Sequence, residues 1–600
     1  MEFEFNTIAE LFLKGTKTFA RNKLYFDKVN GEWVGKTYGE VREIVENFAF
    51  GLASLGIGKD DKVAILSANN SKWAMSDFAI ISLGAVTVSV YPTLIPPQIK
   101  YILQDSETKY IITQDKEQTE KVLSFLDDDA LKLEGIIVME PDSSLPDKML
   151  TFDDVVDKGK TYKQEADFVF EERAEKVQPD DLLTLIYTSG TTGNPKGVML
   201  CHRNLASNII AARKVIEIGP EDRFLSFLPL SHSFERMAGH FTAFSCGGQI
   251  YYAESIDKVA ENMLETHPTV MTSVPRLYEK MYNRVVEKVS TDSPLKQKIF
   301  WWAIKVGKQC LPYLQVDQPL PGGLNIKYQL ANKLVYSKLK ERVGGKLRFF
   351  VSGAAPLSPE IGVFFAAAGL KILEGYGLTE TSPVITINHP DHFKFGTVGF
   401  PIEEVEVKIA EDGEILCRGD NVMLGYYNNP EATTEVLEPD GWFHTGDVGE
   451  FDEDNFLKIT DRKKSLLVTS GGKNVAPAPL ENALSISTYV DQALVIGDKR
   501  KFVSALIVPD FTALAEWAQK EGLPTDNIPE LLKHEKVRAL YDQIIADAMN
   551  QFSRYERVKK YHLVDHSWSI GTGELTPTLK VKRKMVEKKY AQAIDALYED

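Results

Sequence analysis

A run of small, hydroxyl-bearing and basic residues follows directly on Leu182–Ile186, a segment typical of a buried strand. Four serine or threonine hydroxyls, three glycines and one lysine lie within eleven residues: Tyr187, Thr188, Ser189, Gly190, Thr191, Thr192, Gly193, Asn194, Pro195, Lys196 and Gly197. Glycine lets backbone amides approach an anion, hydroxyl groups donate hydrogen bonds, and Lys196 adds a positive charge. The run predicts a polyphosphate-binding loop, although its composition alone also fits a surface turn.

This loop is not a Walker A motif. No GxxxxGK[ST] string runs through it, and Lys196 is followed by Gly197 rather than by a hydroxyl residue that could hold magnesium. A different class of phosphate loop is therefore expected.

Two further strand-like segments end in small or polar residues. Residues 347–351 precede the loop 352–356, and residues 371–373 precede the loop 374–381. Small residues after a strand let a flat ring lie against the backbone, or simply allow a tight turn. Because strand ends in an open α/β sheet meet at one crevice, these loops and the 187–197 loop are predicted to converge on one ligand.

Two more segments contain residues that could take part in catalysis or binding. His232 lies in 226–236, which we interpret as a strand running into a helix start; a lone histidine there either lines a site or is an ordinary capping or core residue. The basic tail ends in an extended piece, 574–583, where we look for a catalytic cation, although most lysine runs are solvated surface.

The composition excludes several classes of protein. A net charge of −16 argues against a nucleic-acid binder, and four scattered cysteines argue against a disulfide framework or zinc site and favour a reducing cytoplasm. The acidic residues 1–6 do not form a signal peptide, and the apolar run 78–91 is too short and polar to cross a bilayer. A peripheral membrane contact stays open, because Trp301 and Trp302 lie in a lysine-rich segment, 290–346; packing of one helix face is the simpler interpretation.

The element pattern predicts an α/β protein of layered sheets. Residues 37–56 form a helix pattern with a capping box at Thr37 and Glu40, and short strands alternate with helices at 62–66, 86–90, 110–113 and 135–139. Past residue 396 short alternating strands predict a β subdomain. A polar break at 461–464 predicts two domains, a large one at 1–463 and a small α+β one at 464–600.

Taken together, these motifs resemble the AMP-forming, adenylate-forming superfamily, and in particular its long-chain fatty-acyl-CoA synthetases. The 226–236, 441–447, 470–477 and 575–583 stretches are especially similar to that branch. The resemblance implies a mobile C-terminal domain and two half-reactions with ATP, Mg²⁺ and coenzyme A. A fatty carboxylate first attacks the α-phosphorus to give acyl-AMP and pyrophosphate, and the coenzyme A thiolate then attacks the acyl carbon.

The resemblance also implies residue roles. Lys580 would be the catalytic lysine of adenylation, Thr379 would contact the α-phosphate, Glu380 would bind Mg²⁺, His232 would line the acyl entrance, and Lys464 would be the hinge. The other implied residues are the phosphate loop Thr188, Ser189, Gly190, Thr191, Thr192, Gly193 and Lys196; the adenine and ribose contacts Gly353, Ala354, Ala355, Tyr376, Gly377, Asp447 and Arg462; and the coenzyme A-facing loop Ser470, Gly471, Gly472 and Lys473.

Some positions and alternatives qualify this interpretation. Asp461 replaces a common glycine and Ser465 a frequent acidic residue, which leaves the hinge mechanics in doubt. A fatty acyl-AMP ligase that loads a carrier protein is one alternative. An amino-acid activator is disfavoured, because Ser233-Phe234-Glu235 stands where an amine-binding aspartate would be and no carrier domain is seen. A non-catalytic nucleotide or lipid sensor is disfavoured by the presence of Lys580 and Glu380. Chain-length preference and the choice between monomer and homodimer are not readable from the sequence.

Overall fold

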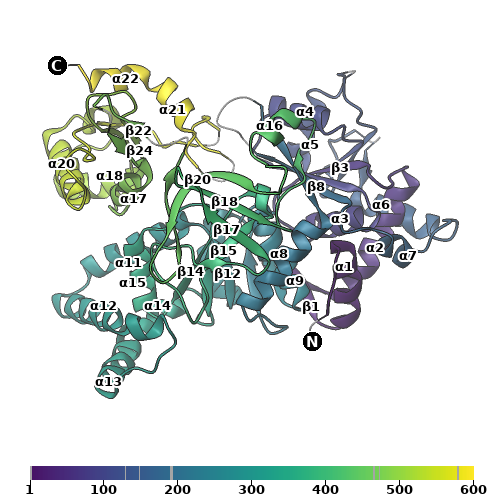
Figure 1. The fold of residues 1–600 in the computed structure, drawn as a ribbon, viewed down its shortest axis with the longest axis horizontal. Coiled ribbons are helices and arrows are strands. Elements are labelled where there is room, and N and C mark those ends of the chain that lie inside the picture. The colour runs from purple at the N-terminus through teal and green to yellow at the C-terminus, as the bar shows by residue number, and fades with distance from the viewer. Residues whose placement is uncertain are drawn as a thin grey trace.

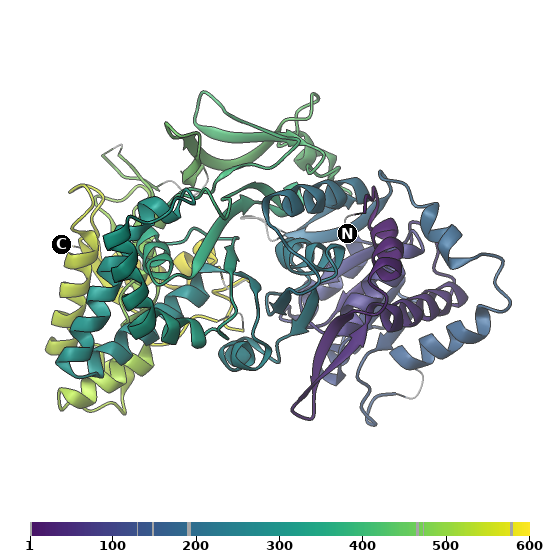
Figure 2. The same ribbon diagram turned by 90° about the horizontal axis from the view of Figure 1, so that it is seen from below.

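The chain folds into two large sheets, one small antiparallel sheet and a separate C-terminal α+β unit (Figures 1 and 2). The computed structural model describes residues 3–599 except 129, 147–148, 189–193, 464–466, 472, 570 and 577–579. In that part of the chain, no helix is both long and apolar enough to cross a bilayer.

The first large sheet is parallel over most of its width. Its spatial order is β19 (Gly425–Tyr426), β9 (Lys196–Cys201), β8 (Leu182–Thr188), β4 (Val86–Val90), β3 (Lys62–Leu66), β5 (Tyr110–Thr113), β6 (Gly135–Val138) and β7 (Leu150–Thr151). Neighbours from β8 to β7 are parallel, whereas β9 and β19 are antiparallel additions. The strands predicted at 62–66, 86–90 and 110–113 have the predicted bounds, and β6 ends one residue early.

The second large sheet is parallel at its centre. Its order is β16 (Phe400–Pro401), β15 (Val384–Ile387), β14 (Lys371–Gly377), β13 (Phe349–Ser352), β12 (Val270–Ser273), β10 (Arg223–Ser226), β11 (Gln249–Tyr252), β1 (Lys23–Val29) and β2 (Glu32–Thr37). The strands from β14 to β1 run parallel, and antiparallel strands close both edges. One hydrophobic core joins the two sheets, since it includes Leu183 and Ile186 of β8 together with Val351 of β13 and Leu373 of β14.

The predicted β subdomain is confirmed as an antiparallel sheet of β17 (Val405–Ile409), β18 (Glu414–Gly419), β20 (Phe443–Phe451) and β21 (Leu457–Arg462). The C-terminal unit has β24 (Val490–Ile496), β25 (Ser504–Pro509) and β26 (Lys560–Leu563), and a hairpin of β22 (Leu467–Val468) and β23 (Asn474–Val475). It has hydrophobic clusters of its own. An ion pair between Arg276 and Asp491 joins it to the N-terminal part (Figure 1).

The helices of the N-terminal part are α1 (Ile8–Thr18), α2 (Tyr38–Ser54), α3 (Ser71–Ser82), α4 (Pro96–Asp105), α5 (Lys116–Leu123), α6 (Phe152–Tyr162), α7 (Phe170–Glu175), α8 (His202–Val215), the π-helix η1 (Glu235–Phe241), α9 (Thr242–Ser245), η2 (Ile256–Lys258), α10 (Val259–Thr266), α11 (Pro275–Thr291), α12 (Pro294–Leu314), α13 (Gly322–Ala331), η3 (Asn332–Tyr336), α14 (Ser337–Glu341), α15 (Pro359–Ala367), η4 (Thr379–Thr381) and α16 (Pro430–Thr434). Those of the C-terminal unit are α17 (Pro477–Ser485), α18 (Phe511–Lys520), α19 (Ile528–Leu531), α20 (Glu535–Met549), α21 (Arg583–Lys589) and α22 (Ala591–Ala596). The capping box predicted at Thr37 and Glu40 is present at the start of α2.

The prediction of a strand running into a helix start at 226–236 is confirmed for the helix, since η1 begins at Glu235, but the strand is wrong. β10 ends at Ser226, and the chain continues as a loop until η1 begins at Glu235. Asn69 supplies the physical reason, because its side-chain amide donates to the Leu228 carbonyl at 2.6 Å and its side-chain oxygen accepts from the Leu230 amide at 2.8 Å. Pro229 also lacks the N–H that a strand ladder requires.

A buried ion pair fixes the π-helix η1 to the first sheet. Arg236 donates from Nε to Asp77 Oδ2 at 2.9 Å, and another of its N–H groups donates to Thr184 Oγ1 of β8 at 2.7 Å. Asp77 on α3 also accepts from Thr87 Oγ1 of β4 at 2.7 Å. Arg236 and Asp77 are 2% and 0% exposed, so both charges depend wholly on these partners.

Candidate active site

Three residues predicted to hold a nucleoside lie in direct contact. The Tyr376 hydroxyl donates to Asp447 Oδ2 at 2.8 Å, and Arg462 Nε donates to Asp447 Oδ1 at 2.8 Å. Asp447 and Arg462 are register partners on β20 and β21, whereas Tyr376 comes from β14 of the second sheet. The small sheet and the second large sheet therefore meet at one buried carboxylate. Among the causes that raise the pKa of Arg462, the charge of Asp447 is the largest.

A second contact group joins the phosphate loop to the segment after β14. The Tyr426 hydroxyl donates to Glu380 Oε1 at 2.9 Å, and Lys196 Nζ lies 4.8 Å from the centre of the Tyr426 ring. Tyr426 is buried on β19, which pairs with β9, and Lys196 is the first residue of β9. The ring thus brings together two predicted site residues, Lys196 of the first sheet and Glu380 of η4, which follows β14 of the second sheet.

Thr379 lies next to the segment that contains His232. Its hydroxyl is 3.3 Å from the Ser233 hydroxyl, and both side chains are buried. Met423 donates its backbone N–H to the Glu380 carbonyl at 2.9 Å, which fixes the short helix η4 against the loop leading to β19.

The backbone near β13 and β14 is tightly constrained. Ala354 has φ of +68°, a left-handed conformation that is uncommon for a residue with a side chain. A Cβ on Gly353 would lie 3.1 Å from the Phe234 ring, and one on Gly377 would lie 1.7 Å from the Pro383 carbonyl oxygen. Gly377 is therefore required by the backbone beside it, whereas a side chain at Gly353 would need the Phe234 ring to shift slightly.

The arrangement of strands differs in two ways from the prediction of three loops at the end of one sheet. The phosphate loop joins β8 to β9 in the first sheet, whereas β13 and β14 belong to the second. Residues 374–377 also remain in β14 instead of forming a loop, because β15 pairs with Gly375, Tyr376 and Gly377. The predicted residues gather where the two sheets meet.

Lys580 reaches this place from the C-terminal unit. It lies close enough to Arg462, Asp447 and His232 to interact electrostatically with all three. Lys580 keeps some exposure to solvent, but many protein atoms lie around its ammonium group. The resulting loss of solvation, and secondarily the Arg462 cation, lower the pKa of Lys580 to about 8. A lysine that is distant in sequence thus lies near Asp447 and Arg462, two of the residues predicted to hold the nucleoside.

His232 is neutral at physiological pH. Burial, and secondarily the Lys580 cation, lower its pKa to about 3. Its Nδ1 accepts the backbone N–H of Phe234 at 3.1 Å, a contact typical of a capping residue. The hydrogen bond supports the interpretation of His232 as an ordinary capping residue. Its position close to Lys580 supports the interpretation as a site residue.

The remaining predicted residues fall into two groups. Ser470, Gly471 and Lys473 lie in the turn between β22 and β23; Ser470 donates its N–H to the Arg500 carbonyl, and the Lys473 ammonium lies over the Tyr555 ring. Both partners, Arg500 and Tyr555, belong to the C-terminal unit. Ser189, Gly190, Thr191, Thr192, Gly193, Lys464 and Gly472 lie outside the described residues.

Sequence reasoning missed Tyr426 and Ser233 as members of the site. Tyr426 stands in an aromatic pair, Tyr426-Tyr427, whose type and spacing carry no signal for chemistry. Only the pairing of β19 with β9 reveals its place.

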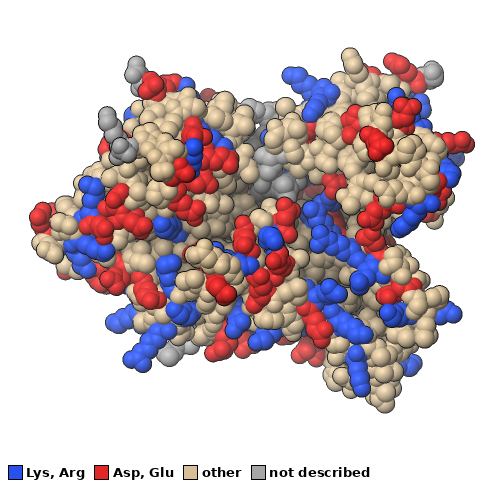
Figure 3. Space-filling view, turned by 180° about the vertical axis from the view of Figure 1, so that it is seen from behind, with Lys and Arg blue, Asp and Glu red and all other residues tan. Residues whose placement is uncertain are grey.

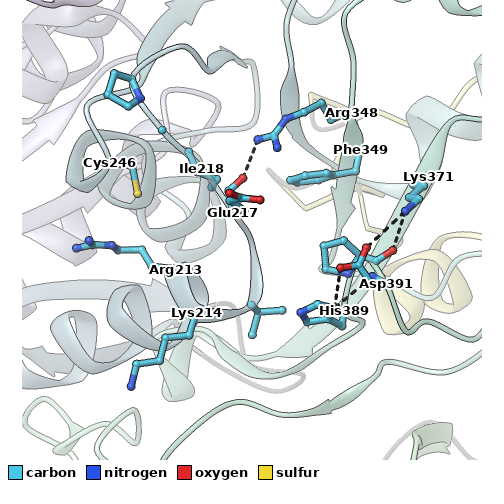
Figure 4. Close-up of a pocket in the computed structure, with 14 residues that line it drawn as sticks. Arg213, Lys214, Glu217, Ile218, Cys246, Arg348, Phe349, Lys371, His389 and Asp391 are labelled. Atoms are coloured by element: carbon cyan, nitrogen blue, oxygen red, sulfur yellow. Dashed lines mark hydrogen bonds and ion pairs between the residues drawn. The ribbon is translucent and has the colours of Figure 1, made fainter. Parts of the chain in front are cut away.

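A cavity of about 740 Å³ lies elsewhere (Figure 4). It is lined by residues at the amino ends of β13 and β14, such as Arg348, Phe349 and Lys371, whereas the predicted site lies towards their carboxyl ends. Arg348 donates to the Glu217 carbonyl and to Asp222, and Lys371 donates to the Pro390 carbonyl. This cavity is separate from the predicted nucleotide site.

Comparison with known proteins identifies the family. Residues 16–427 match the model of the AMP-binding enzyme family, and residues 464–600 match the AMP-binding enzyme C-terminal domain. The long-chain-fatty-acid–CoA ligase FadD15 of Mycobacterium bovis is 37% identical over 583 residues, which cover 96% of this chain and 94% of that protein. The peroxisomal long chain acyl-CoA synthetase 6 of Arabidopsis thaliana is 32% identical over 96% of this chain and 83% of its own.

Solved structures agree in fold. The anthranilate CoA ligase AuaEII, in complex with anthranoyl-AMP, superposes with a TM-score of 0.75 at 20% identity and covers 99% of each chain. A Mycobacterium tuberculosis fatty acyl CoA synthetase superposes with a TM-score of 0.61 at 21% identity over 98% of this chain and 99% of that one. With these matches, and with the predicted motifs gathered between two sheets and a separate C-terminal domain, this chain belongs to the AMP-binding enzyme family.

Proposed function

We propose that this enzyme converts a long-chain fatty acid to its acyl-CoA through an acyl-AMP intermediate, with ATP and coenzyme A as co-substrates. The position of Lys580 close to the Tyr376–Asp447–Arg462 group is the observation that supports this proposal most. The long-chain fatty acyl-CoA ligases among its relatives support the substrate class.

The geometry suggests a division of labour for adenylation. Asp447 and Arg462 would hold the ribose hydroxyls, while Tyr376, Gly377 and the 353–355 backbone would bracket adenine. The phosphate loop, residues 188–196, would hold the β- and γ-phosphates, and Thr379 would contact the α-phosphate. The Lys580 cation would then stabilise the charge that develops between the fatty carboxylate and the α-phosphorus.

The residues present fit a magnesium ion. Mg²⁺ is commonly held by one or two carboxylates together with substrate phosphates. Glu380 offers such a carboxylate, and the hydrogen bond from the Tyr426 hydroxyl fixes the position of that carboxylate. Among the described residues no cluster of three or more metal-ligating side chains exists, so ATP oxygens and water would complete the shell. When bound, the ion would neutralise phosphate charge.

Thioester formation would require a second arrangement. We propose that the domain 464–600 turns about Lys464 relative to domain 1–463, which removes Lys580 and brings the turn of Ser470, Gly471, Gly472 and Lys473 to the pantetheine arm. His232 would then line the acyl entrance as a neutral group.

The test of this function is a product assay. Purified protein with ATP, Mg²⁺, coenzyme A and a series of fatty acids is expected to form AMP and acyl-CoA, with long chains preferred. Formation of acyl-AMP that coenzyme A cannot release, but a carrier protein can, would support the acyl-AMP ligase alternative instead.

Tyr426→Phe is expected to raise the Mg²⁺ concentration required for half-maximal ATP–pyrophosphate exchange by about tenfold, because an outer-shell partner of a metal ligand is lost. The phenylalanine ring still lies under Lys196, so nucleotide binding measured without metal should stay unchanged. Tyr427→Phe is the matched control, since its ring contacts Lys62 instead. An unchanged Mg²⁺ midpoint would contradict this role for Tyr426.

Adenylation is expected to decline as the pH rises through about 8, where Lys580 loses its proton. The measurement is kcat/KM for ATP in the exchange reaction, because it reports the free enzyme. Lys580→Arg keeps its charge to far higher pH and should show no decline in that range, whatever its absolute rate. A decline shared by both enzymes would assign the titration to another group.

We also propose a cytoplasmic location with a peripheral membrane contact. All four cysteines are buried thiols, which fits a reducing compartment.

A further inference from the structure

The segment that follows α11 forms a projecting lobe of opposite charge to the rest of the chain. The lobe, residues 294–342, consists of α12, α13, η3 and α14 and extends away from the sheets (Figure 1). It contains eight lysines and one arginine but only one aspartate and one glutamate, a net charge of +7 in a chain of net charge −16. Figure 3 shows this lobe at the lower right, with blue side chains around a largely uncharged end.

The end of the lobe carries a stripe of exposed aliphatic side chains. Ile326, Leu330 and Leu334 are 73%, 49% and 40% exposed, and they follow one another four residues apart along α13 and η3. Residues at this spacing share one face of a helix. Lys327 and Lys333 are exposed beside them. Single exposed apolar residues are ordinary, but an aliphatic stripe bordered by lysines is an interaction surface.

The outer face of α12 has a related composition. Lys298, Trp301, Lys305 and Lys308 recur at helical spacing, and all four are exposed, Trp301 by 45%. Tryptophan amid lysines suits the boundary between water and lipid, where an amphipathic ring and snorkelling cations both find partners. The two interpretations of this tryptophan pair, packing and lipid contact, apply to different members of it, because Trp302 packs on a hydrophobic cluster while Trp301 is exposed.

The lobe is firmly attached to the catalytic part of the molecule. The inner face of α12 is buried, and a Cβ on Gly307 would lie 2.1 Å from the carbonyl oxygen of Ala367 on α15. The strand after α15 is β14, which carries Tyr376. The lobe therefore presents its basic and apolar surface from a fixed position relative to the site.

We propose that the lobe of residues 294–342 docks the enzyme on an anionic lipid bilayer. Its lysines would lie at the lipid phosphates, and Ile326, Leu330 and Leu334 would enter the boundary between headgroups and acyl chains. Bilayers rather than an acidic protein are favoured because the aliphatic stripe is narrow and its neighbours are almost all lysine. The proposal rests on the proposed function for its purpose, since long-chain fatty acids dissolve in bilayers.

The test is sedimentation of the full chain with vesicles, without ATP or coenzyme A. Binding is expected to vesicles that contain phosphatidylglycerol, weakly or not at all to pure phosphatidylcholine, and to fall as salt rises. Ile326→Ser/Leu330→Ser/Leu334→Ser and Lys298→Gln/Lys305→Gln/Lys308→Gln should each weaken binding by about tenfold or more. The matched control is Val169→Ser/Ile256→Ser/Leu264→Ser, three exposed aliphatic residues elsewhere, which should bind as the parent does.

Other results would overturn the proposal. These are absence of binding to anionic vesicles, equal binding to both vesicle types, or equal loss in the control. A parent that is dimeric in solution and becomes monomeric in the aliphatic variant would assign the stripe to a second copy of this chain. Acyl-CoA formation from a detergent-dispersed acid should be unchanged in all three variants. Vesicle binding without any acyl-CoA formation would refute the proposed function alone.

Discussion

Lys580→Ala is expected to slow acyl-AMP formation by about 10²–10³-fold, the usual effect of removing one preorganised donor of positive charge. The structure places this lysine close to Arg462, Asp447 and His232, so its removal takes a positive charge away from the predicted site. Conversion of preformed acyl-AMP and coenzyme A to acyl-CoA should continue at the parental rate, because that step would use the other domain arrangement.

The two half-reactions are measured separately, by ATP–pyrophosphate exchange and by thioester formation from synthetic acyl-AMP. Lys584→Ala is the control, because it removes an exposed lysine on α21, four residues further along the chain. Adenylation at the parental rate in Lys580→Ala would remove the lysine from the mechanism. Equal loss in both half-reactions would indicate that the domain arrangement does not alternate.

Arg236→Met is expected to destabilise the N-terminal part by about 3–5 kcal/mol, since it leaves the Asp77 carboxylate charged and buried without its main partner. Asp77→Leu should have a comparable effect for the reciprocal reason. The double variant, Arg236→Met with Asp77→Leu, should recover most of the loss because neither charge remains.

The free energy of unfolding of the N-terminal part is measured in urea, with tryptophan fluorescence following the transition around Trp73, which lies 5.7 Å from the Arg236 guanidinium. Lys258→Met serves as control, because it breaks an ion pair with Glu261 in which both side chains are more than half exposed. It should change stability far less. A double variant no more stable than the sum of the single changes would contradict the pairing argument.

The parts of the fold that local patterns determine were predictable. The strands at 62–66, 86–90 and 110–113 are short runs rich in β-branched and apolar residues between breaks, and Thr37 with Glu40 defines the start of a helix by itself. The segment 226–236 was not predictable, because the hydrogen bonds that replace a strand ladder come from Asn69, more than 150 residues earlier. Its apolar residues gave a strand pattern that this distant side chain overrides.

The candidate site shows the same division. Motif strings pointed to Lys196, Glu380, Asp447 and Arg462, but not to the elements that supply them, which are β9 of the first sheet, the helix η4, and β20 and β21 of the small sheet. The contact of Tyr426 with Glu380 joins residues 46 positions apart, and that of Arg236 with Asp77 joins residues 159 apart. Such contacts depend on how the sheets are stacked, which no local pattern in one sequence specifies.

The register of β20 with β21 has a thermodynamic consequence. It places Arg462 opposite Asp447 at the last residue of β21, and Lys463 is still fixed, because its N–H donates to the Gly446 carbonyl and its ammonium pairs with Asp412 and Glu414. The residues that would grip the nucleotide thus lie directly before the C-terminal domain in the chain. By linkage, any factor by which one orientation of that domain binds AMP more tightly must equal the factor by which AMP favours that orientation. The affinity for AMP and the equilibrium between domain orientations would then be coupled by the same free energy, so rotation of the domain would change how readily AMP is released.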